Sequence, residues 1–334
     1  KPDFALAHVN ISFVLLLTEN FKQGWQEYEW RLRIKGRTPK TLLKPLWDGS
    51  SLNGKSILVY TEQGFGDSIQ FVRYLPMVKA QNGRVIVECQ QSLCRLLKNC
   101  DGIDEIIEKT HNDEAPMQID VHVPLLSLAG IFDVNMDSIS SYVPYIKPDP
   151  VLVSEWNTIL DHDSNFKVGI VWASDPKNKN IYHKKSCKLN DFESISGIPG
   201  LSFYSLQKGP ASAEVHNSPK GMKIISLDNE LNDFADTAAV IANLDLVISV
   251  DTAVAHLTGA IGKPVWTLLP FASDWRWLLK HKDSPWYPSM RLFRQYQPGD
   301  WGGVFDKVKQ ALISNFGVRN AEHKKKYLSR QNVN

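Results

Sequence analysis

Two runs of alternating strand and helix patterns, separated by a cluster of prolines, constrain this chain more than any other feature. In the first run, short apolar segments at 56–60, 84–88 and 119–123 have the length and bounding residues of buried strands. Helical patterns begin between them at Asp67 and Gln91. Alternation of this kind predicts an α/β fold with a parallel, doubly wound sheet.

The same alternation restarts after the prolines. Pro144, Pro148 and Pro150 predict a linker between two similar halves. The strands predicted beyond them are 167–172, 201–206, 245–250 and 264–269, and the helices are 233–243, 253–261 and 301–316. Because ligands of open α/β sheets bind at the carboxyl ends of the strands, the loops after these strands are the candidate sites.

The two ends of the chain have a different texture. Residues 4–31 show two helical patterns that predict a hairpin, followed by a basic connector that ends at Lys40. A lone hairpin cannot bury its own apolar face, so we expect it to pack on another part of the chain. The tail at 319–334 contains three consecutive lysines and few apolar residues, which predicts a mobile segment.

Charge and hydropathy exclude two classes of protein. Lys and Arg number 38 against 36 Asp and Glu, so the net charge is +2 and no large basic field is present for nucleic acid. No apolar run approaches the ~20 residues of a membrane span. Four cysteines without a CxxC pair predict reduced thiols and a cytoplasmic protein. No signal peptide is expected, and because the first residue is Lys1 the presence of an upstream segment stays open.

The turn after the strand at 245–250 is the first candidate site. Thr252 is placed to cap the helix that follows, and the unpaired amides at a helix start favour a phosphate. His256 lies four residues later and therefore on the same helix face as Thr252. A capped, buried helix with one hydrogen-bonded histidine explains the pattern equally well.

The loop at 61–68 is the second candidate. Gly64 and Gly66 permit a tight turn and a close approach of the backbone to a ligand. Asp67 then stands at a helix N-terminus, as a general base or as the N-cap, and the pattern by itself favours the cap. The missing third glycine argues against a dinucleotide fingerprint and thus against a nicotinamide dehydrogenase.

Basic residues after two further strands complete the candidates. Lys208 can reach a diphosphate as a point charge, and so can Lys185 beside Ser186. Each lysine by itself is more often a solvated surface charge.

Five stretches, in this order along the chain, resemble the glycosyltransferase domain attached to bacterial tetratricopeptide-repeat (TPR) proteins. They are EQGFGDSIQF at 62–71, SLQKG at 205–209, DFADTAA at 233–239, SVDTAVAHL at 249–257 and DWRW at 274–277. That domain is similar to the lipopolysaccharide heptosyltransferases of glycosyltransferase family 9, and some of its members are flagellin glycosyltransferases. The helical start resembles the last repeat of such an array, at Asn10, Leu15, Gly24, Trp25 and Tyr28.

The resemblance implies a GT-B fold, in which two Rossmann-like domains face a cleft. An acceptor domain is expected at 45–148 and a nucleotide-sugar domain at 149–318, with a TPR-like hairpin at 1–40. The implied reaction moves a sugar from a nucleotide-sugar to a hydroxyl of a protein or glycan, with inversion and without a metal or other cofactor.

The resemblance also assigns roles by position. Asp67 matches the acceptor-activating aspartate, and His256 is the second implied catalytic residue. The implied acceptor-side loop contains Gln63, Gly64 and Gly66. The implied donor side contains Trp172, Lys185, Ser186, Gln207, Lys208, Asp251, Thr252, Ala253 and His256. Ala253 stands where heptosyltransferases have glycine and Gln207 where they carry a carboxylate, so the sugar and the base of the donor stay open.

Two hypotheses from different classes therefore remain. The first is a glycosyltransferase, and the second is a TPR-linked module that binds sugar or protein without turnover. The hairpin carries no clustered acid, base or phosphate loop, so we expect it to be structural or to recruit the acceptor.

Overall fold

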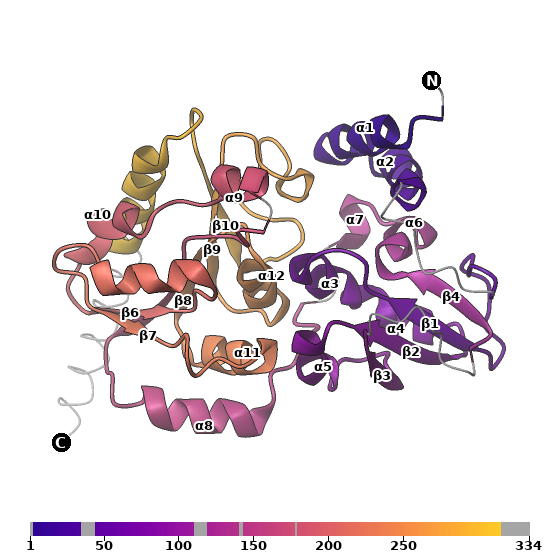
Figure 1. The fold of residues 1–334 in the computed structure, drawn as a ribbon, viewed down its shortest axis with the longest axis horizontal. Coiled ribbons are helices and arrows are strands. Elements are labelled where there is room, and N and C mark those ends of the chain that lie inside the picture. The colour runs from indigo at the N-terminus through magenta and orange to yellow at the C-terminus, as the bar shows by residue number, and fades with distance from the viewer. Residues whose placement is uncertain (1–2, 35–43, 110–118, 140–142, 178, 315–334) are drawn as a thin grey trace, which may run out of the picture.

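Two parallel β-sheets form the frame of the molecule, one in each half (Figure 1). The computed structural model describes residues 3–34, 44–109, 119–139, 143–177 and 179–314. The predicted tail at 319–334 and most of the basic connector lie outside the described residues.

The first sheet has four parallel strands in the order β3-β2-β1-β4. Its strands are β1 (Ser56–Tyr60), β2 (Arg84–Cys89), β3 (Glu105–Glu108) and β4 (Val121–Pro124). Three of them confirm the predicted segments. β4 begins two residues later than predicted, which is within the accuracy with which a sequence places the boundary of a strand. β3 was not predicted, because it is an edge strand with only two apolar residues between glutamates.

Short helices follow the strands of the first half. They are α3 (Phe65–Phe71), η2 (Val72–Tyr74), α4 (Leu75–Lys79), α5 (Gln91–Leu97), η3 (Leu125–Ser127), α6 (Leu128–Ile131) and α7 (Met136–Ile139). The start of α3 corrects the prediction, since the helix begins two residues before Asp67 and Gly64 is its N-cap.

The second sheet has six parallel strands in the order β10-β9-β8-β5-β6-β7. Its strands are β5 (Phe166–Val171), β6 (Leu201–Ser205), β7 (Ile224–Ser226), β8 (Leu246–Val250), β9 (Val265–Leu269) and β10 (Met290–Arg294). The four predicted strands are confirmed to within one residue. The two that were missed, β7 and β10, are the edges, where the sequence lacks a long apolar run.

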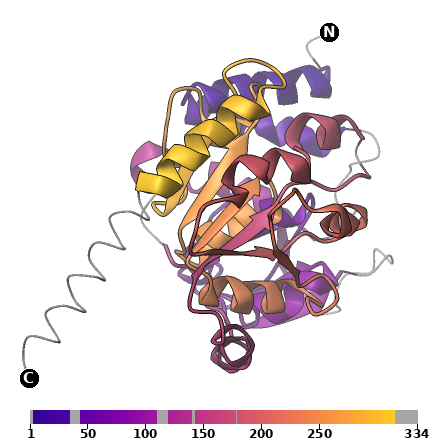
Figure 2. The same ribbon diagram turned by 90° about the vertical axis from the view of Figure 1, so that its left-hand side faces the viewer.

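Helices cover both faces of the second sheet (Figure 2). They are α8 (Pro150–Leu160), α9 (Lys179–Lys185), η4 (Leu189–Phe192), α10 (Glu193–Ser196), η5 (Pro210–Asn217), α11 (Phe234–Asn243), α12 (Ala253–Ala260), η6 (Trp275–Trp277) and a helix at 301–314. The proline at the end of the predicted linker starts α8. Asp149 accepts a hydrogen bond from the N–H of Val151 at 2.8 Å, and Pro150 occupies the first turn, where its missing N–H is harmless.

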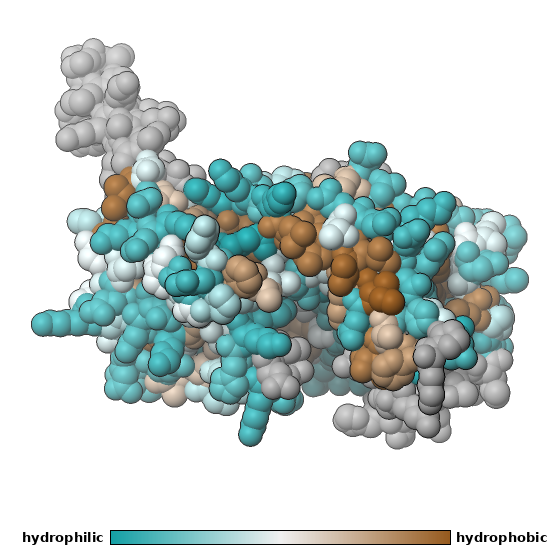
Figure 3. Space-filling model, turned by 90° about the horizontal axis from the view of Figure 1, so that it is seen from above, coloured by the Kyte–Doolittle hydropathy of each residue, from teal (hydrophilic) through white to brown (hydrophobic). Residues whose placement is uncertain are grey.

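The N-terminal hairpin is confirmed as two packed helices, α1 (Ala5–Leu17) and α2 (Phe21–Tyr28), continued by η1 (Glu29–Arg33). Gly24 lets them approach closely, because a Cβ there would lie 2.6 Å from Cδ2 of Leu16. The outer face of α1 leaves large apolar side chains exposed, on the side of the molecule that Figure 3 shows. These side chains are Leu6, Ile11, Phe13 and Val14, and Phe4 just before the helix is exposed as well.

The hairpin packs on both halves of the molecule. The indole N–H of Trp25 donates to the carbonyl of Val134 in the first half at 2.7 Å. The same ring makes an edge contact with Trp275 of the second half, with 5.4 Å between the centroids. The expected packing partner of the hairpin is therefore the junction between the halves.

Within the described ranges, every helix is too short or too polar to cross a bilayer. The four cysteines are free thiols.

Candidate active site

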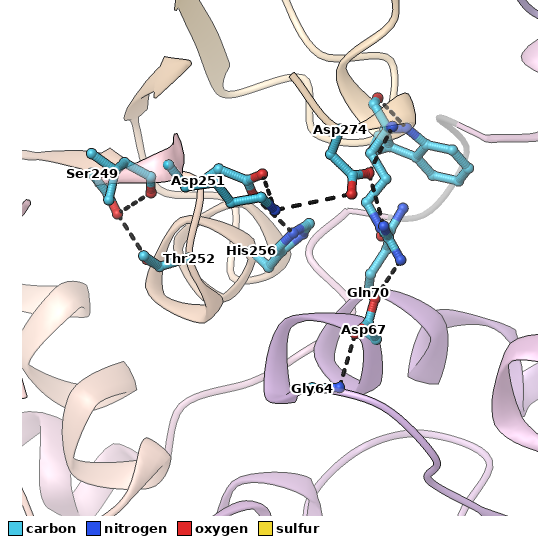
Figure 4. Close-up of polar contacts among 12 residues, drawn as sticks. Gly64, Asp67, Gln70, Ser249, Asp251, Thr252, His256 and Asp274 are labelled. Atoms are coloured by element: carbon cyan, nitrogen blue, oxygen red, sulfur yellow. Dashed lines mark hydrogen bonds and ion pairs between the residues drawn. The ribbon is translucent and has the colours of Figure 1, made fainter. Parts of the chain in front are cut away.

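The N-termini of α3 and α12 meet where the two halves touch, and the candidate residues gather there (Figure 4). β1 ends in the loop that leads to α3, and β8 ends in the turn that leads to α12. The carboxyl ends of two strands, one from each sheet, thus supply the site, as expected for α/β folds.

Asp67 is the third residue of α3 and not its N-cap residue, which is Gly64. Its Oδ2 accepts a hydrogen bond from the backbone N–H of Gly64 at 2.9 Å. The carboxylate thereby satisfies an unpaired donor and lies where the helix dipole favours negative charge. Its Oδ1 pairs with the guanidinium of Arg276, which comes from the other half.

Arg276 is buried at this junction, and its guanidinium and backbone N–H make further polar contacts besides the bond to Asp67. Its Nε donates to Oε1 of Gln70 at 2.5 Å, and its Nη1 donates to Oδ1 of Asp274 at 2.9 Å. The backbone N–H of Arg276 donates to the same Asp274 oxygen at 3.1 Å. Burial alone would raise the pKa of Asp274, but Arg276 and Lys185 outweigh burial and lower it.

Lys185 connects Asp274 to the donor-side turn. Its Nζ lies 2.6 Å from Oδ2 of Asp251 and 4.0 Å from Oδ2 of Asp274. Burial would lower the pKa of Lys185, but the two carboxylates raise it above its ordinary value. The lysine is therefore a charged group at this junction.

Thr252 is the N-cap residue of α12, as predicted, yet its hydroxyl does not cap the helix. Its Oγ1 lies 2.9 Å from Oγ of Ser249, within hydrogen-bond distance. The first amides of α12 are consequently left without a side-chain cap, which suits the expected role of this turn in holding a phosphate.

His256 is buried within α12 and is neutral near pH 7. Burial lowers its pKa to about 3, against the opposing effect of Asp251. Its Nδ1 lies 2.9 Å from the hydroxyl of Tyr287, its Nε2 lies 3.9 Å from Oδ1 of Asp251, and its ring stacks on Trp277.

The backbone at Gly66 makes a close approach, as predicted, but the group that it approaches belongs to the other half of the protein. A Cβ on Gly66 would lie 2.9 Å from Cδ2 of His256 and 3.6 Å from Cα of Ala253. Where the sequence predicts a cleft, the described residues of α3 and α12 are in direct contact.

Other predicted donor-side residues lie outside this cluster or form hydrogen bonds with nearby backbone groups. Lys208 pairs with Asp228 at 3.2 Å. The Oε1 of Gln207 accepts from the backbone N–H groups of Trp172 and Ala173, so its amide joins two strand ends.

The side chains of Ser186 and Trp172 also contact other parts of the second half. Oγ of Ser186 accepts from the N–H of Ser174 at 3.0 Å. The Trp172 side chain is fully buried in the core of the second half.

The acceptor-side loop is held by the hairpin. Nε2 of Gln63 donates to the hydroxyl of Tyr28 at 3.0 Å, and Arg31 pairs with Glu62 at 2.7 Å. Burial is the main cause that raises the pKa of Tyr28. The nearby charges act on the same pKa, since Arg276 lowers it and Asp67 raises it. The hairpin thus reaches the candidate site, which its sequence alone did not predict.

Sequence reasoning missed the roles of Asp274, Arg276 and Tyr287. The first two lie in the DWRW stretch that carried part of the family resemblance, and that stretch was the available signal. The partner of Arg276 could not be identified, because Asp67 is 209 positions away in the chain.

Residues 212–299 match the sequence model of glycosyltransferase family 9 (heptosyltransferase). The matched region lies in the second half. This region contains Asp251, Thr252, His256 and Arg276, whereas Asp67 lies outside it.

A curated relative, the protein FlbA of Caulobacter vibrioides, is 27% identical over 335 residues. The match covers 93% of this chain and 55% of FlbA, so the chain spans about half the length of the curated relative it matches.

Two solved structures have a similar fold. A family 9 glycosyltransferase from Veillonella parvula has a TM-score of 0.59 at 13% identity, covering 80% of this chain and 99% of that chain. The ADP-heptose lipopolysaccharide heptosyltransferase II of E. coli has a TM-score of 0.55 at 12% identity, covering 78% and 99%. The two structures confirm an α/β fold with parallel sheets, similar to that of the GT-B heptosyltransferases, and the family match at 212–299 agrees with the predicted glycosyltransferase.

Proposed function

We propose that this protein transfers a sugar from a nucleotide-sugar donor to a hydroxyl group of a protein or glycan. One observation carries the proposal, namely the meeting of an acid from one half with cations from the other. Asp67 lies at the start of α3, facing Arg276, while Lys185 lies beside the uncapped start of α12. A base and a diphosphate site are thereby adjacent.

The proposed reaction uses these groups in one step. The acceptor oxygen attacks the anomeric carbon, and Asp67 takes its proton. The bond between the anomeric carbon and the diphosphate oxygen breaks, and its electron pair leaves with the nucleoside diphosphate. General-base help of this kind contributes roughly 10²–10⁴-fold to the rate.

The leaving diphosphate would be stabilised by Lys185 and by the N-terminus of α12. Preorganised positive charge aimed at developing negative charge is usually the largest catalytic contribution. We propose that these groups supply the charge without a metal ion, and that the configuration at the anomeric carbon is inverted. His256, being neutral, would serve as a hydrogen-bonding group for donor or sugar.

For the donor, an ADP-sugar is the first to test, because the similar E. coli structure is an ADP-heptose lipopolysaccharide heptosyltransferase. A protein acceptor of the flagellin type fits the resemblance of the helical start to a repeat array. We place the activity in the cytoplasm, because four free thiols suit a reducing compartment.

A second candidate is a binding module without turnover. The observation that favours it is the engagement of both Asp67 oxygens, one by Arg276 and one by Gly64. In that case Asp67 would join the halves and would not remove a proton.

Screening with ADP-, UDP-, GDP- and CMP-sugars distinguishes the two candidates. Thermal shift measures binding, and release of the free nucleotide in the absence of acceptor (a nucleoside diphosphate from ADP-, UDP- and GDP-sugars, CMP from CMP-sugars) measures turnover. A transferase should release nucleotide from the sugar that stabilises it. Stabilisation with no release, also after addition of acceptor lysate, would favour the binding module.

A further inference from the structure

Arg276 belongs to the second half of the protein but ends on the carboxylate of the first. Its side chain is 8% exposed and its guanidinium lies 4.3 Å from the centre of the Trp275 ring. Nη2 reaches Asp67 and Nε reaches Oε1 of Gln70, three residues further along α3. The guanidinium is therefore fixed against one face of α3.

Arg276 is also one member of a row of alternating charges. Asp251 pairs with Lys185 at 2.6 Å, and Lys185 lies 4.0 Å from Asp274. Asp274 pairs with Arg276 at 2.9 Å, and Arg276 pairs with Asp67. Three carboxylates and two cations thus connect the donor-side turn with the proposed base.

We infer, on the basis of the proposed function, that Arg276 is the positioning residue of Asp67. It holds Oδ1 while the Gly64 N–H holds Oδ2, so the carboxylate has one orientation. An ionised carboxylate has about four lone-pair sites, so two remain for the proton of an acceptor. Because the guanidinium comes from the second half, the base is oriented only while the two halves are in contact.

Other arginines at the junction have contacts that suit a purely structural role. Arg73 is buried but donates to neutral oxygens, among them the carbonyl of Trp286 at 3.1 Å and the hydroxyl of Tyr145 at 3.0 Å. Arg95 pairs with Asp233 across the halves at 2.9 Å, and half of its side chain is exposed. Arg95 is thus a matched control, since it joins the halves without touching Asp67.

The test compares Arg276→Gln, Arg276→Lys and Arg95→Gln in the full chain. Release of the free nucleotide is measured with the sugar from the four-nucleotide panel that the wild type hydrolyses, and affinity for that same nucleotide is measured by calorimetry. Misplacement of a catalytic group by about 1 Å costs roughly 10²-fold. We therefore expect Arg276→Gln to lower kcat by roughly 10²-fold with little change in affinity, Arg276→Lys to retain part of the rate, and Arg95→Gln to remain near wild type.

Two further measurements separate positioning from folding. In an Asp67→Asn background, Arg276→Gln should lower kcat little further, because both changes act on one group. For Arg276→Ala, millimolar methylguanidinium should restore part of the rate, whereas an equal concentration of urea should not. A structural effect would give additive losses and no rescue.

The outcomes are distinguishable. Full activity of Arg276→Gln, an equal loss in Arg95→Gln, or additive losses without rescue would overturn the role of Arg276 while the transferase stands. A wild-type protein that turns over none of the four sugar classes would overturn the proposed function itself, and the inference with it.

Discussion

Gly66 and His256 lie so close together that a Cβ on the glycine would be 2.9 Å from Cδ2 of the histidine. The histidine ring cannot move aside easily, because it stacks on Trp277 and bonds Tyr287. The two halves can pack this closely because Gly66 has no side chain. The sequence pattern had indicated that this backbone approaches a ligand.

The first prediction concerns Gly66→Ala. Alanine favours the helix by up to about 1 kcal/mol over glycine, but overpacking typically costs about 1–3 kcal/mol. We expect a net loss of roughly 1–2 kcal/mol in thermal or urea unfolding. Gly302→Ala is the control, because it is also helical and its nearest neighbour, Oδ1 of Asp300, is 4.0 Å away. Equal effects of the two changes would contradict a tight contact.

The second prediction concerns Asp67→Asn. Asparagine keeps the shape and an accepting oxygen but cannot take a proton near neutral pH. Sugar transfer should fall by roughly 10²-fold or more while donor affinity changes little, because the base acts mainly in the transition state. If Asp67 only satisfies the Gly64 N–H, the variant should transfer sugar at close to the wild-type rate, and His256 becomes the next candidate.

The third prediction compares two lysines that the sequence ranked alike. Lys185 lies in the charged cluster, whereas Lys208 is held by Asp228. Lys185→Met should weaken binding of the nucleoside diphosphate about tenfold or more, as expected for a charge-assisted hydrogen bond. Lys208→Met should change the calorimetric affinity far less. The reverse order, in variants with wild-type circular dichroism, would place the phosphates elsewhere.

The fourth prediction concerns the hairpin. Trp25 is 3% exposed and packs between Trp275 and Phe71, so its ring joins both halves. Trp25→Ala should destabilise the protein by about 3–5 kcal/mol in urea unfolding. Val14→Ala, on the exposed face of α1, should change stability by less than about 0.5 kcal/mol.

Removal of the hairpin, in a chain that starts near Leu43, tests the same packing contacts. The hairpin supplies Tyr28 and Arg31 to the acceptor-side loop, so the shortened chain should lose stability and turnover together. Full turnover by the shortened chain would show that the hairpin does not support the site.

The fifth prediction is a pH dependence. Burial lowers the pKa of His256 to about 3, whereas an unfolded histidine titrates near pH 6.5. Between these values the unfolded state binds a proton that the folded state does not, so stability falls as the pH falls. From pH 7 to pH 5 the loss should be about 2 kcal/mol.

His256→Gln is the control for this slope. Other groups also titrate between pH 7 and pH 5, but the variant retains them. Urea unfolding at both pH values should therefore show a smaller loss in His256→Gln than in the wild type by about 2 kcal/mol. Equal slopes would mean that His256 is not held neutral.

The sequence by itself determined the two parallel sheets and their central strands. Segments such as 56–60 and 245–250 are short, mostly apolar and bounded by polar residues, which is typical of strands buried on both faces of a parallel sheet. It also placed Asp67, Thr252 and His256 in the segments where a helix follows a strand, since that position is local in the chain.

Only the tertiary structure decided how these ends face one another. Gln207 and Lys208 looked like donor contacts, but their side chains are used by nearby backbone and by Asp228. The pairing of Arg276 with Asp67 joins residues 209 positions apart. Charges in a sequence show no partner, because an ion pair depends on a distance in space that is set when the two halves pack together.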